Sequence, residues 1–373
     1  MSMIRAVFSR CRKLREAGKR VVDAHIGAPS HRPPAPVEEL LASIGEVGSG
    51  YVSGFSPGRD YTPFPGLDGV REAAAEFASR FLGVSYSPER TVITASGAHG
   101  CFVAFSLFKG REVLLPKPGF PLYYMQAELA GVKQRYYSPT AEDIVEEVLA
   151  RVTGETAAVL VNYPNNPTGW VPSSSRLEEL WAELQSKYIT LINDAVYHEL
   201  YYVERPSYPG DIILDTASKC FALPGIRAGF LYSQTRELAD KAARVVYYTT
   251  AGVADISQIV YAEVMRKATE SYFEEVRRYY RRKRDMLAEE LRGLGFKFIE
   301  PRGAFYIYTT HPKIEDTIRL ADSLLREDRE ACIGVVPGEG FSGSPRWMRI
   351  SYGRLSEEDI KIMARELRKE LEG

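Results

Sequence analysis

One lysine of this chain lies where its amine could act as a reagent. Lys219 sits in the stretch DTASKCFALPGIRAGF, residues 215–230, between small hydroxyl residues and a Gly-Ile-Arg turn. A lysine amine becomes a covalent catalyst when it forms a Schiff base with a carbonyl group that is held beside an electron sink. Lysines are mostly exposed on protein surfaces, so these neighbours alone leave a solvated cation open as the alternative.

A second stretch could bind an anion. TASGAHG, residues 94–100, follows a predicted strand and opens a predicted helix. The backbone amides of Gly97, Ala98 and His99 would then point at an anion at the N-terminus of that helix. Turns of this kind are common in α/β folds, so the signal is weak by itself. No G-x-x-x-x-G-K-[ST] pattern is present, which argues against a P-loop.

One cofactor, pyridoxal phosphate, would need both features. It supplies the aldehyde and the electron sink for the lysine, and its phosphate is the anion. Its site also needs a carboxylate at the pyridine nitrogen, a donor at the ring hydroxyl and an aromatic platform. Eight motifs bear on this, in this order: IGAPS, YTPFPGLDGVREA, TASGAHG, PGFPLY, NYPNNPTG, NDAVY, SKCFALPGIRAGF and RISYG. With them the chain resembles, from about residue 21 to its C-terminus, a class I/II aminotransferase of the fold-type I pyridoxal-phosphate enzymes, near the aspartate and aromatic aminotransferases.

The resemblance implies which residues bind this cofactor. Lys219 matches the Schiff-base lysine, Asp194 the carboxylate at the pyridine nitrogen, and Tyr197 a donor to the ring oxygen. A carboxylate there favours the protonated nitrogen and so strengthens the electron sink. The other positions that match cofactor contacts are Gly97, Ala98, His99, Phe120, Asn166, Thr216, Ser218, Arg227 and Tyr61. In the family the tyrosine at the position of Tyr61 reaches the cofactor phosphate of the neighbouring subunit, which implies a homodimer with shared active sites.

The resemblance also implies a substrate side to the site, at Gly27, Asn166 and Arg349. An arginine fork can clamp the α-carboxylate of an amino acid and so orient its Cα–H bond. A dicarboxylate needs a further cation, and Arg32, Arg59 and Arg302 lie in loops near the site motifs. Each of them could equally be a solvated surface charge. The 23 tyrosines and 16 phenylalanines would also furnish an apolar pocket for aromatic donors.

Short apolar runs alternate with amphipathic helical stretches along the chain, which predicts an α/β fold. The runs lie at residues 90–96, 111–116, 156–164, 188–194, 211–218 and 227–233. The resemblance implies a mostly parallel seven-stranded sheet with helices on both faces, plus a smaller α+β domain. We expect the large domain at residues 45–280, and the small domain to combine residues 1–44 with residues 281–373. A long helix around residues 272–294 would join the two.

Composition and charge favour a small-molecule enzyme. The 373 residues include 48 Lys and Arg against 49 Asp and Glu, for a net charge of -1, so neither nucleic acid nor an anionic membrane is expected as the main partner. The four cysteines lie far apart and no cleavable signal pattern is seen, which indicates the cytoplasm. Residues 4–14 have helical apolar spacing, which predicts an amphipathic helix packed on the body, with a transit peptide as the alternative.

The function expected from these features is transfer of the amino group of an L-amino acid, aspartate, aromatic or similar, to a 2-oxo acid such as 2-oxoglutarate. It would run by ping-pong kinetics through a Schiff base at Lys219, with pyridoxal phosphate as cofactor and no metal. A carbon-sulfur β-lyase of the same fold and a non-catalytic relative are the alternatives.

Overall fold

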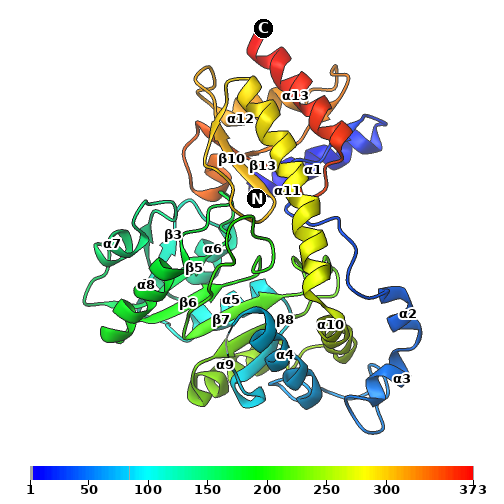
Figure 1. Cartoon of the computed structure of the whole chain (residues 1–373), viewed down its shortest axis with the longest axis vertical. Helices are drawn as coiled ribbons and strands as arrows, with labels where there is room; N and C mark the ends of the chain where they lie inside the picture. Colours follow the sequence, from blue (N-terminus) through cyan, green and yellow to red (C-terminus); the bar gives the residue numbers. More distant parts are fainter. Residues whose placement is uncertain (1–2, 84, 373) are drawn as a thin grey trace.

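Figure 1 shows the computed structural model, which describes residues 3–83 and 85–372. Its largest sheet has seven strands, in the order β2 (Thr91–Thr94), β8 (Gly229–Ser233), β7 (Ile212–Thr216), β6 (Thr190–Asp194), β5 (Thr156–Asn162), β3 (Glu112–Pro116) and β4 (Lys133–Tyr137). Strand β8 is antiparallel to both of its neighbours, and all other pairs are parallel. The predicted α/β fold class is confirmed, and all six predicted apolar runs contribute strands.

The inner strands β3, β5, β6 and β7 are mostly apolar because helices cover both faces of the sheet. Along β3, Val113 and Leu115 belong to one core and Leu114 to another. The first core is shared with α5 (Gly97–Ser106) and α6 (Pro121–Leu129). The second is shared with α7 (Ile144–Leu149) and α8 (Ser174–Ser186). Alternate residues of one strand therefore face opposite helical layers.

Strand β4 is the one strand of this sheet that no predicted run covered. Its sequence, KQRYY, is mostly exposed, and only Tyr137 is buried. It pairs with β3 alone, at the edge of the sheet. Edge strands often carry charged side chains because these discourage pairing with other chains, so the apolar pattern used to find the other strands is missing here.

A smaller antiparallel sheet lies beside the upper part of the long helix α11 (Glu270–Gly293) in the view of Figure 1. Its strands are β12 (Val336–Pro337), β13 (Trp347–Ser351), β10 (Tyr306–Thr310) and β9 (Lys297–Phe298). Helices α12 (Thr317–Leu324) and α13 (Glu357–Glu372) accompany it. The predicted domain boundaries at residues 44/45 and 280/281 stay a prediction.

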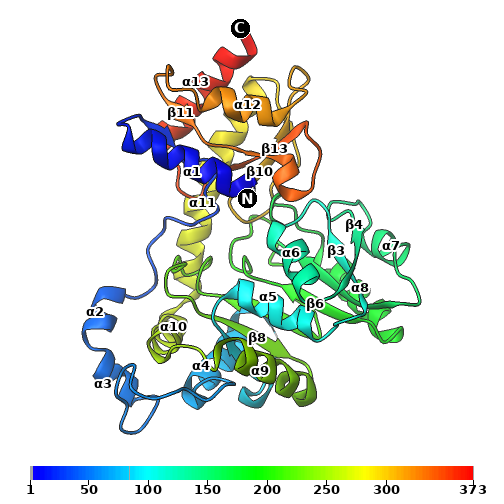
Figure 2. The same ribbon diagram turned by 180° about the vertical axis from the view of Figure 1, so that it is seen from behind.

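The N-terminal segment folds back onto this smaller part. Strand β1 (Val21–Val22) pairs in parallel with β11 (Cys332–Ile333), and Figure 2 shows α1 (Met3–Glu16) alongside the small sheet. The buried residues of α1 are Val7, Cys11 and Leu14, which pack with Leu325. The predicted amphipathic helix is therefore present, and it packs on the body of the protein.

The remaining helices surround the large sheet: α2 (Val37–Ala42), α3 (Ile44–Ser49), α4 (Asp68–Phe81), α9 (Arg236–Thr250), α10 (Asp255–Lys267) and the 3-10 turn η1 (Pro88–Arg90). A second 3-10 turn, η2 (Gly338–Phe341), follows β12. Helices α2 and α3 lie at the outer edge, joined to the small part by an extended segment (Figure 1). No helix among the described residues is both long and apolar enough to cross a membrane.

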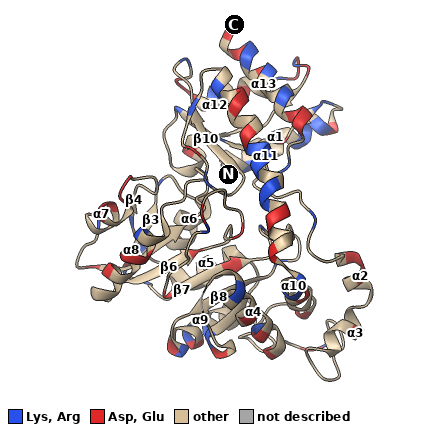
Figure 3. Ribbon diagram, viewed as in Figure 1, with Lys and Arg blue, Asp and Glu red and all other residues tan. Residues whose placement is uncertain are grey.

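Charges of both signs are interspersed over the elements, as Figure 3 shows. The basic run of α11 bonds to groups of the same chain: Arg277 pairs with Glu199 at 2.7 Å, Arg282 with Glu357 at 2.7 Å, and Lys283 donates to the Tyr279 hydroxyl at 2.6 Å. These three cations of α11 are therefore engaged within the chain.

Candidate active site

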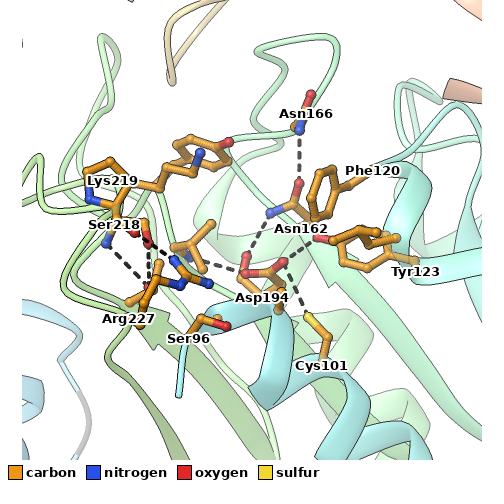
Figure 4. A pocket seen from close by; sticks show the side chains of 17 residues that line it. Ser96, Cys101, Phe120, Tyr123, Asn162, Asn166, Asp194, Ser218, Lys219 and Arg227 are labelled. Atoms are coloured by element: carbon orange, nitrogen blue, oxygen red, sulfur yellow. Dashed lines mark hydrogen bonds between the residues drawn. The ribbon is translucent and has the colours of Figure 1, made fainter. Parts of the chain in front are cut away.

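The candidate site lies at the edge of the large sheet where three parallel strands end side by side. Asn162, Asp194 and Thr216 are the last residues of β5, β6 and β7. A cavity of about 260 Å³ opens at these ends, as expected for an α/β sheet (Figure 4). The predicted site residues that line it are Gly97, Ala98, Phe120, Asn166, Asp194, Tyr197, Thr216, Ser218, Lys219 and Arg227.

Asp194 is a buried carboxylate with several donors. Its Oδ2 accepts from the Tyr123 hydroxyl and, at 3.9 Å, from the Cys101 thiol, and its Oδ1 faces the Val196 amide at 3.4 Å (Figure 4). Burial raises the pKa of Asp194 to about 6, although the Tyr123 hydroxyl opposes this. A cationic ring nitrogen beside this carboxylate would stabilise its charged form.

Lys219 extends from the turn after β7 toward the centre of the cavity. Its Nζ donates to the Gly27 carbonyl at 2.6 Å and lies 5.6 Å from the centre of the Tyr197 ring. Burial, and next the charge of Arg349, lower the pKa of Lys219 to about 8. An amine with this pKa is partly neutral near pH 7, as a nucleophile or a general base must be.

One end of the cavity is built to receive an anion. Helix α5 begins at Gly97, and the Ser96 side chain caps it by accepting from the His99 amide at 3.1 Å. The hydroxyls of Thr216 and Ser218 lie 3.1 Å apart across from it. A Cβ at position 97 would meet the Thr216 Cβ at 3.2 Å, so glycine keeps this end open. Helix N-terminus, hydroxyls and the nearby Arg227 together suit a phosphate.

These groups fit pyridoxal phosphate. The phosphate would lie among Gly97, Ala98, Thr216, Ser218 and Arg227, which line one cavity with Asp194 and Lys219. Asp194 would meet the ring nitrogen, and its raised pKa reflects a buried carboxylate without a cationic partner of its own. Phe120 lines the same cavity and provides an aromatic surface for the ring. The chemistry of the donor set therefore matches a phosphorylated, cationic aromatic ring.

Arg349 lies beside this cavity, on β13, and is 3 % exposed. Its Nη1 donates to Asn166 Oδ1 at 3.0 Å, and its Nη2 to the His25 carbonyl at 2.8 Å. Its Nε is buried and has no hydrogen-bond partner among the described residues. Since buried donors are nearly always satisfied, this N–H is a group that a bound carboxylate could engage.

Gly27 lies between Lys219 and Arg349, at a position where a side chain would collide with its neighbours. A Cβ at this position would lie 2.8 Å from the Tyr306 hydroxyl and 3.5 Å from Arg349 Nη1. The Tyr306 hydroxyl in turn lies 2.7 Å from that of Tyr197. The structure therefore brings the predicted substrate residues Gly27, Asn166 and Arg349 together.

Two predicted contacts lie away from the cavity. The amide of His99 is bonded to Ser96, its ring accepts from the Ala95 amide at 3.0 Å, and its Nε2 lies 2.8 Å from Thr249 Oγ1. The His99 amide is thus engaged by the N-cap serine, and the predicted His99 contact to the cofactor stays a prediction. Tyr61 is 94 % exposed and shares a separate hollow with Arg59.

The candidate cations for a distal carboxylate also lie outside the cavity. Arg302 donates to the Val171 carbonyl at 3.1 Å and stacks on Trp170 at 3.9 Å. Arg32 and Arg59 are exposed. The cations that line the cavity or contact it are thus Lys219, Arg227 and Arg349 among the described residues.

Several site residues were missed in the sequence: Ser96, Cys101, Tyr123, Asn162 and Tyr306. Asn162 donates to the Asp194 carbonyl at 2.9 Å and accepts from the Asn166 amide at 3.0 Å. A polar residue at the end of an apolar strand was a usable signal for Asn162, as was a serine before the helical Gly97 for Ser96. Tyr123 and Tyr306 carry no such signal, because a buried tyrosine looks like any core aromatic.

Comparisons with known proteins agree with this geometry. The profile of the family "Aminotransferase class I and II" matches residues 34–367. The aspartate/prephenate aminotransferase of Thermus thermophilus is 32% identical over 95% of this chain and 92% of its own length. The aspartate aminotransferase of Pyrococcus horikoshii is 29% identical over 100% of this chain and 95% of its own. The structure of Thermus thermophilus aspartate aminotransferase with maleate has a TM-score of 0.88, 29% identity, and covers 99% of this chain and 96% of that one.

Proposed function

Because the chain belongs to the class I and II aminotransferase family and is a pyridoxal-phosphate-dependent aminotransferase, we propose that it uses a dicarboxylic amino acid, aspartate, as its amino donor. The acceptor would be 2-oxoglutarate, and aromatic amino acids would be secondary donors. The observation that carries this is the similarity to relatives named for aspartate, one of them solved with the dicarboxylate maleate.

Some residues of the cavity would hold the cofactor, and Lys219 would move a proton. When bound, pyridoxal phosphate supplies an aldehyde for the amine and a ring that withdraws electrons. Lys219 Nζ, with its pKa lowered to about 8 by burial, would accept the proton of the substrate Cα as a general base and give it up again as a general acid. The Asp194 carboxylate would hold the cofactor at its ring nitrogen and favour the protonated form of that nitrogen. The Tyr197 hydroxyl would hold the ring oxygen.

Arg349 orients the substrate for this proton transfer. Its fork is already fixed by Asn166 and the His25 carbonyl, so little side-chain freedom is lost when a carboxylate binds. The unpartnered Nε adds a donor. A substrate α-carboxylate bound by Arg349 would direct the Cα–H bond toward Lys219 Nζ. Lys219 Nζ is held on this side of the cavity by its hydrogen bond to the Gly27 carbonyl, at 2.6 Å.

We also propose that the chain forms a homodimer in which each subunit contributes to the active site of the other. We propose the cytoplasm as its compartment. Tyr61, Phe64, Tyr247 and Tyr248 are exposed aromatic residues, and three of them lie in ring contact. Such patches mark protein interfaces. A partner on this surface would accept Tyr61, together with Arg59, beside its own cavity. The four cysteines are buried free thiols, which suits a reducing compartment.

Mixing inactive subunits tests the shared site. Lys219→Ala should be inactive, and Tyr61→Ala should bind cofactor about tenfold more weakly, because one hydrogen bond to a phosphate is worth roughly 1.5 kcal/mol. In mixed dimers one of the two sites would carry both defects and the other neither. At limiting cofactor, mixing should therefore raise the activity above that of Tyr61→Ala alone. Tyr188→Ala, which removes an equally exposed tyrosine on another surface, is the control. No gain on mixing would contradict shared sites.

A donor panel tests the substrate. We expect kcat/KM with 2-oxoglutarate to be at least about tenfold higher for aspartate than for alanine or phenylalanine, since a hydrogen bond to a charged group contributes about 1.5–3 kcal/mol. Arg59→Gln should reduce the aspartate value alone, because Arg59 would reach the partner's site with Tyr61. Arg302→Gln, at an arginine engaged by Trp170, is the matched control. Equal values for all donors would overturn the proposed preference.

A further inference from the structure

Residues 24–32, here called the crossover segment, run between β1 and α2 and lie against both halves of the site. On the side of β13, the Ser351 amide donates to the Ala24 carbonyl at 2.7 Å and the Ser351 hydroxyl to the Ile26 carbonyl at 2.7 Å. On the other side, Lys219 Nζ donates to the Gly27 carbonyl. The crossover segment therefore connects the strand that carries Arg349 with the turn that carries Lys219.

A histidine of the crossover segment makes a second contact with that turn. His31 Nε2 lies 3.0 Å from the Cys220 carbonyl, and its Nδ1 lies 2.8 Å from the Tyr280 hydroxyl of α11. A carbonyl can only accept, so Nε2 carries the hydrogen and Nδ1 accepts from Tyr280. The Tyr280 oxygen also accepts from the amides of Ser30 and His31, at 2.9 and 3.3 Å. Each of these donors and acceptors is used, which fixes the tautomer and the orientation of the ring.

The two contacts brace the same turn. Lys219 and Cys220 are consecutive, and they bond to residues 27 and 31 of the crossover segment. Cys220 is fixed again at its thiol, which donates to the Val196 carbonyl at 3.4 Å. Burial keeps the pKa of His31 low, at about 4, so the ring is neutral at physiological pH and keeps this pattern of donor and acceptor.

We propose that His31 is a positioning residue, which sets the reach of Lys219 Nζ by holding the Cys220 carbonyl against the crossover segment and α11. This inference rests on the proposed role of Lys219 as the base. It also gives Cys220 a role, as the point at which the turn is anchored. Because the same segment bonds to Arg349 through the His25 carbonyl, His31 couples the position of the base to that of the carboxylate clamp.

Three substitutions at one position test this. His31→Gln places an amide donor about where Nε2 lies, so the bond to Cys220 can be kept. His31→Asn reaches only as far as Nδ1, and His31→Phe fills the space without any donor. We expect His31→Asn and His31→Phe to lower kcat about tenfold with KM for aspartate within about twofold, and His31→Gln to remain within about twofold of the parent. The isotope effect with Cα-deuterated aspartate should rise in the first two only.

A measurement on the cofactor-free protein separates a changed position of Lys219 from a general loss of stability. The pH midpoint for labelling of Lys219 by a small amine reagent, followed by peptide mass, should be near 8 in the parent. It should move up toward the ordinary lysine value in His31→Asn and His31→Phe, and stay in place in His31→Gln. The groups that face Lys219 remain the same in all variants: Arg349, Asp194, Arg227, Cys220 and Tyr197.

The control is Tyr272→Phe, because this hydroxyl donates to the Arg32 carbonyl at 3.0 Å and makes only a longer contact, at 3.3 Å, with the Cys220 carbonyl; kcat should change by less than about twofold. Equal kcat and equal labelling midpoints for His31→Gln and His31→Asn would overturn the inference, even if His31→Phe fails to fold. If instead Lys219→Ala retains activity, the proposed function fails, whatever the result at His31.

Discussion

Replacing Lys219 with alanine is expected to abolish transamination, with kcat at least about 10⁴-fold lower, the upper end of what a positioned general base contributes. Lys219 is the one lysine that lines the cavity among the described residues. No neighbouring amine could replace it as base or as partner of the aldehyde. The measurement is kcat with aspartate, together with the absorbance band of the cofactor linked to an amine.

Lys219→Arg distinguishes charge from chemistry. A guanidinium keeps the positive charge but stays protonated at any working pH, so it cannot act as base, and this variant should be as inactive as Lys219→Ala. Lys241→Ala is the control, because Lys241 forms an exposed pair with Glu237 at 2.7 Å on α9. Rapid turnover of Lys219→Ala with several donors would refute the assignment of the base.

The Asp194→Asn variant is expected to be less active than the parent and also more stable toward unfolding. Activity should fall at least about 100-fold, the usual loss when one preorganised charge is removed from an active site. Burial raises the pKa of this carboxyl from 3.8 to about 6 in the folded protein. The folded state therefore binds this proton more tightly than the unfolded state, and stability falls as pH rises from about 4 to about 6.

The size of the effect follows from that shift. At about 1.4 kcal/mol for each pH unit, the ionised carboxylate costs about 3 kcal/mol at pH 7. The cofactor-free Asp194→Asn protein should thus be about 1–3 kcal/mol more stable than the parent at pH 7, and the difference should vanish below pH 4. Denaturant unfolding at the two pH values measures this. Asp240→Asn on the surface of α9 is the control, and a destabilised Asp194→Asn at pH 7 would contradict the buried-charge explanation.

Apolar patterning was sufficient to predict the sheet wherever strands are covered on both sides. It failed at β4, whose KQRYY sequence reflects an edge. For the site, Lys219, Asp194 and Arg349 could be proposed from the resemblance, because their motifs occur together in the order of the family; the neighbours of Lys219 alone left its role open. Asp194 and Lys219 lie close together because the parallel strands β6 and β7 end at one edge of the large sheet, whereas Arg349 comes from β13 of the small sheet.

What the sequence could not supply is the set of groups that surround these residues. Tyr123 donates to Asp194 from α6, and Tyr306 meets Tyr197 from the small sheet. Both depend on packing between distant elements, and neither has a local pattern. The bond of the His99 amide, by contrast, has a local cause, which is capping of α5 by Ser96.

The reversed direction of β8 has a consequence for how the site assembles during folding. Because β8 runs back along β7, Thr216 bonds to the Ala228 carbonyl across a separation of only 12 residues, so the part of the phosphate end formed by residues 216–228 closes locally. The end of the site that would bind the substrate carboxylate depends on the hydrogen bond between Arg349 and the His25 carbonyl, two residues that are 324 positions apart. Closing a longer loop costs more entropy and slows contact formation. Thr216, Ser218, Lys219 and Arg227 of the cofactor half thus lie in one short stretch of the chain. The half that would bind the substrate carboxylate forms only when the two ends of the chain have met.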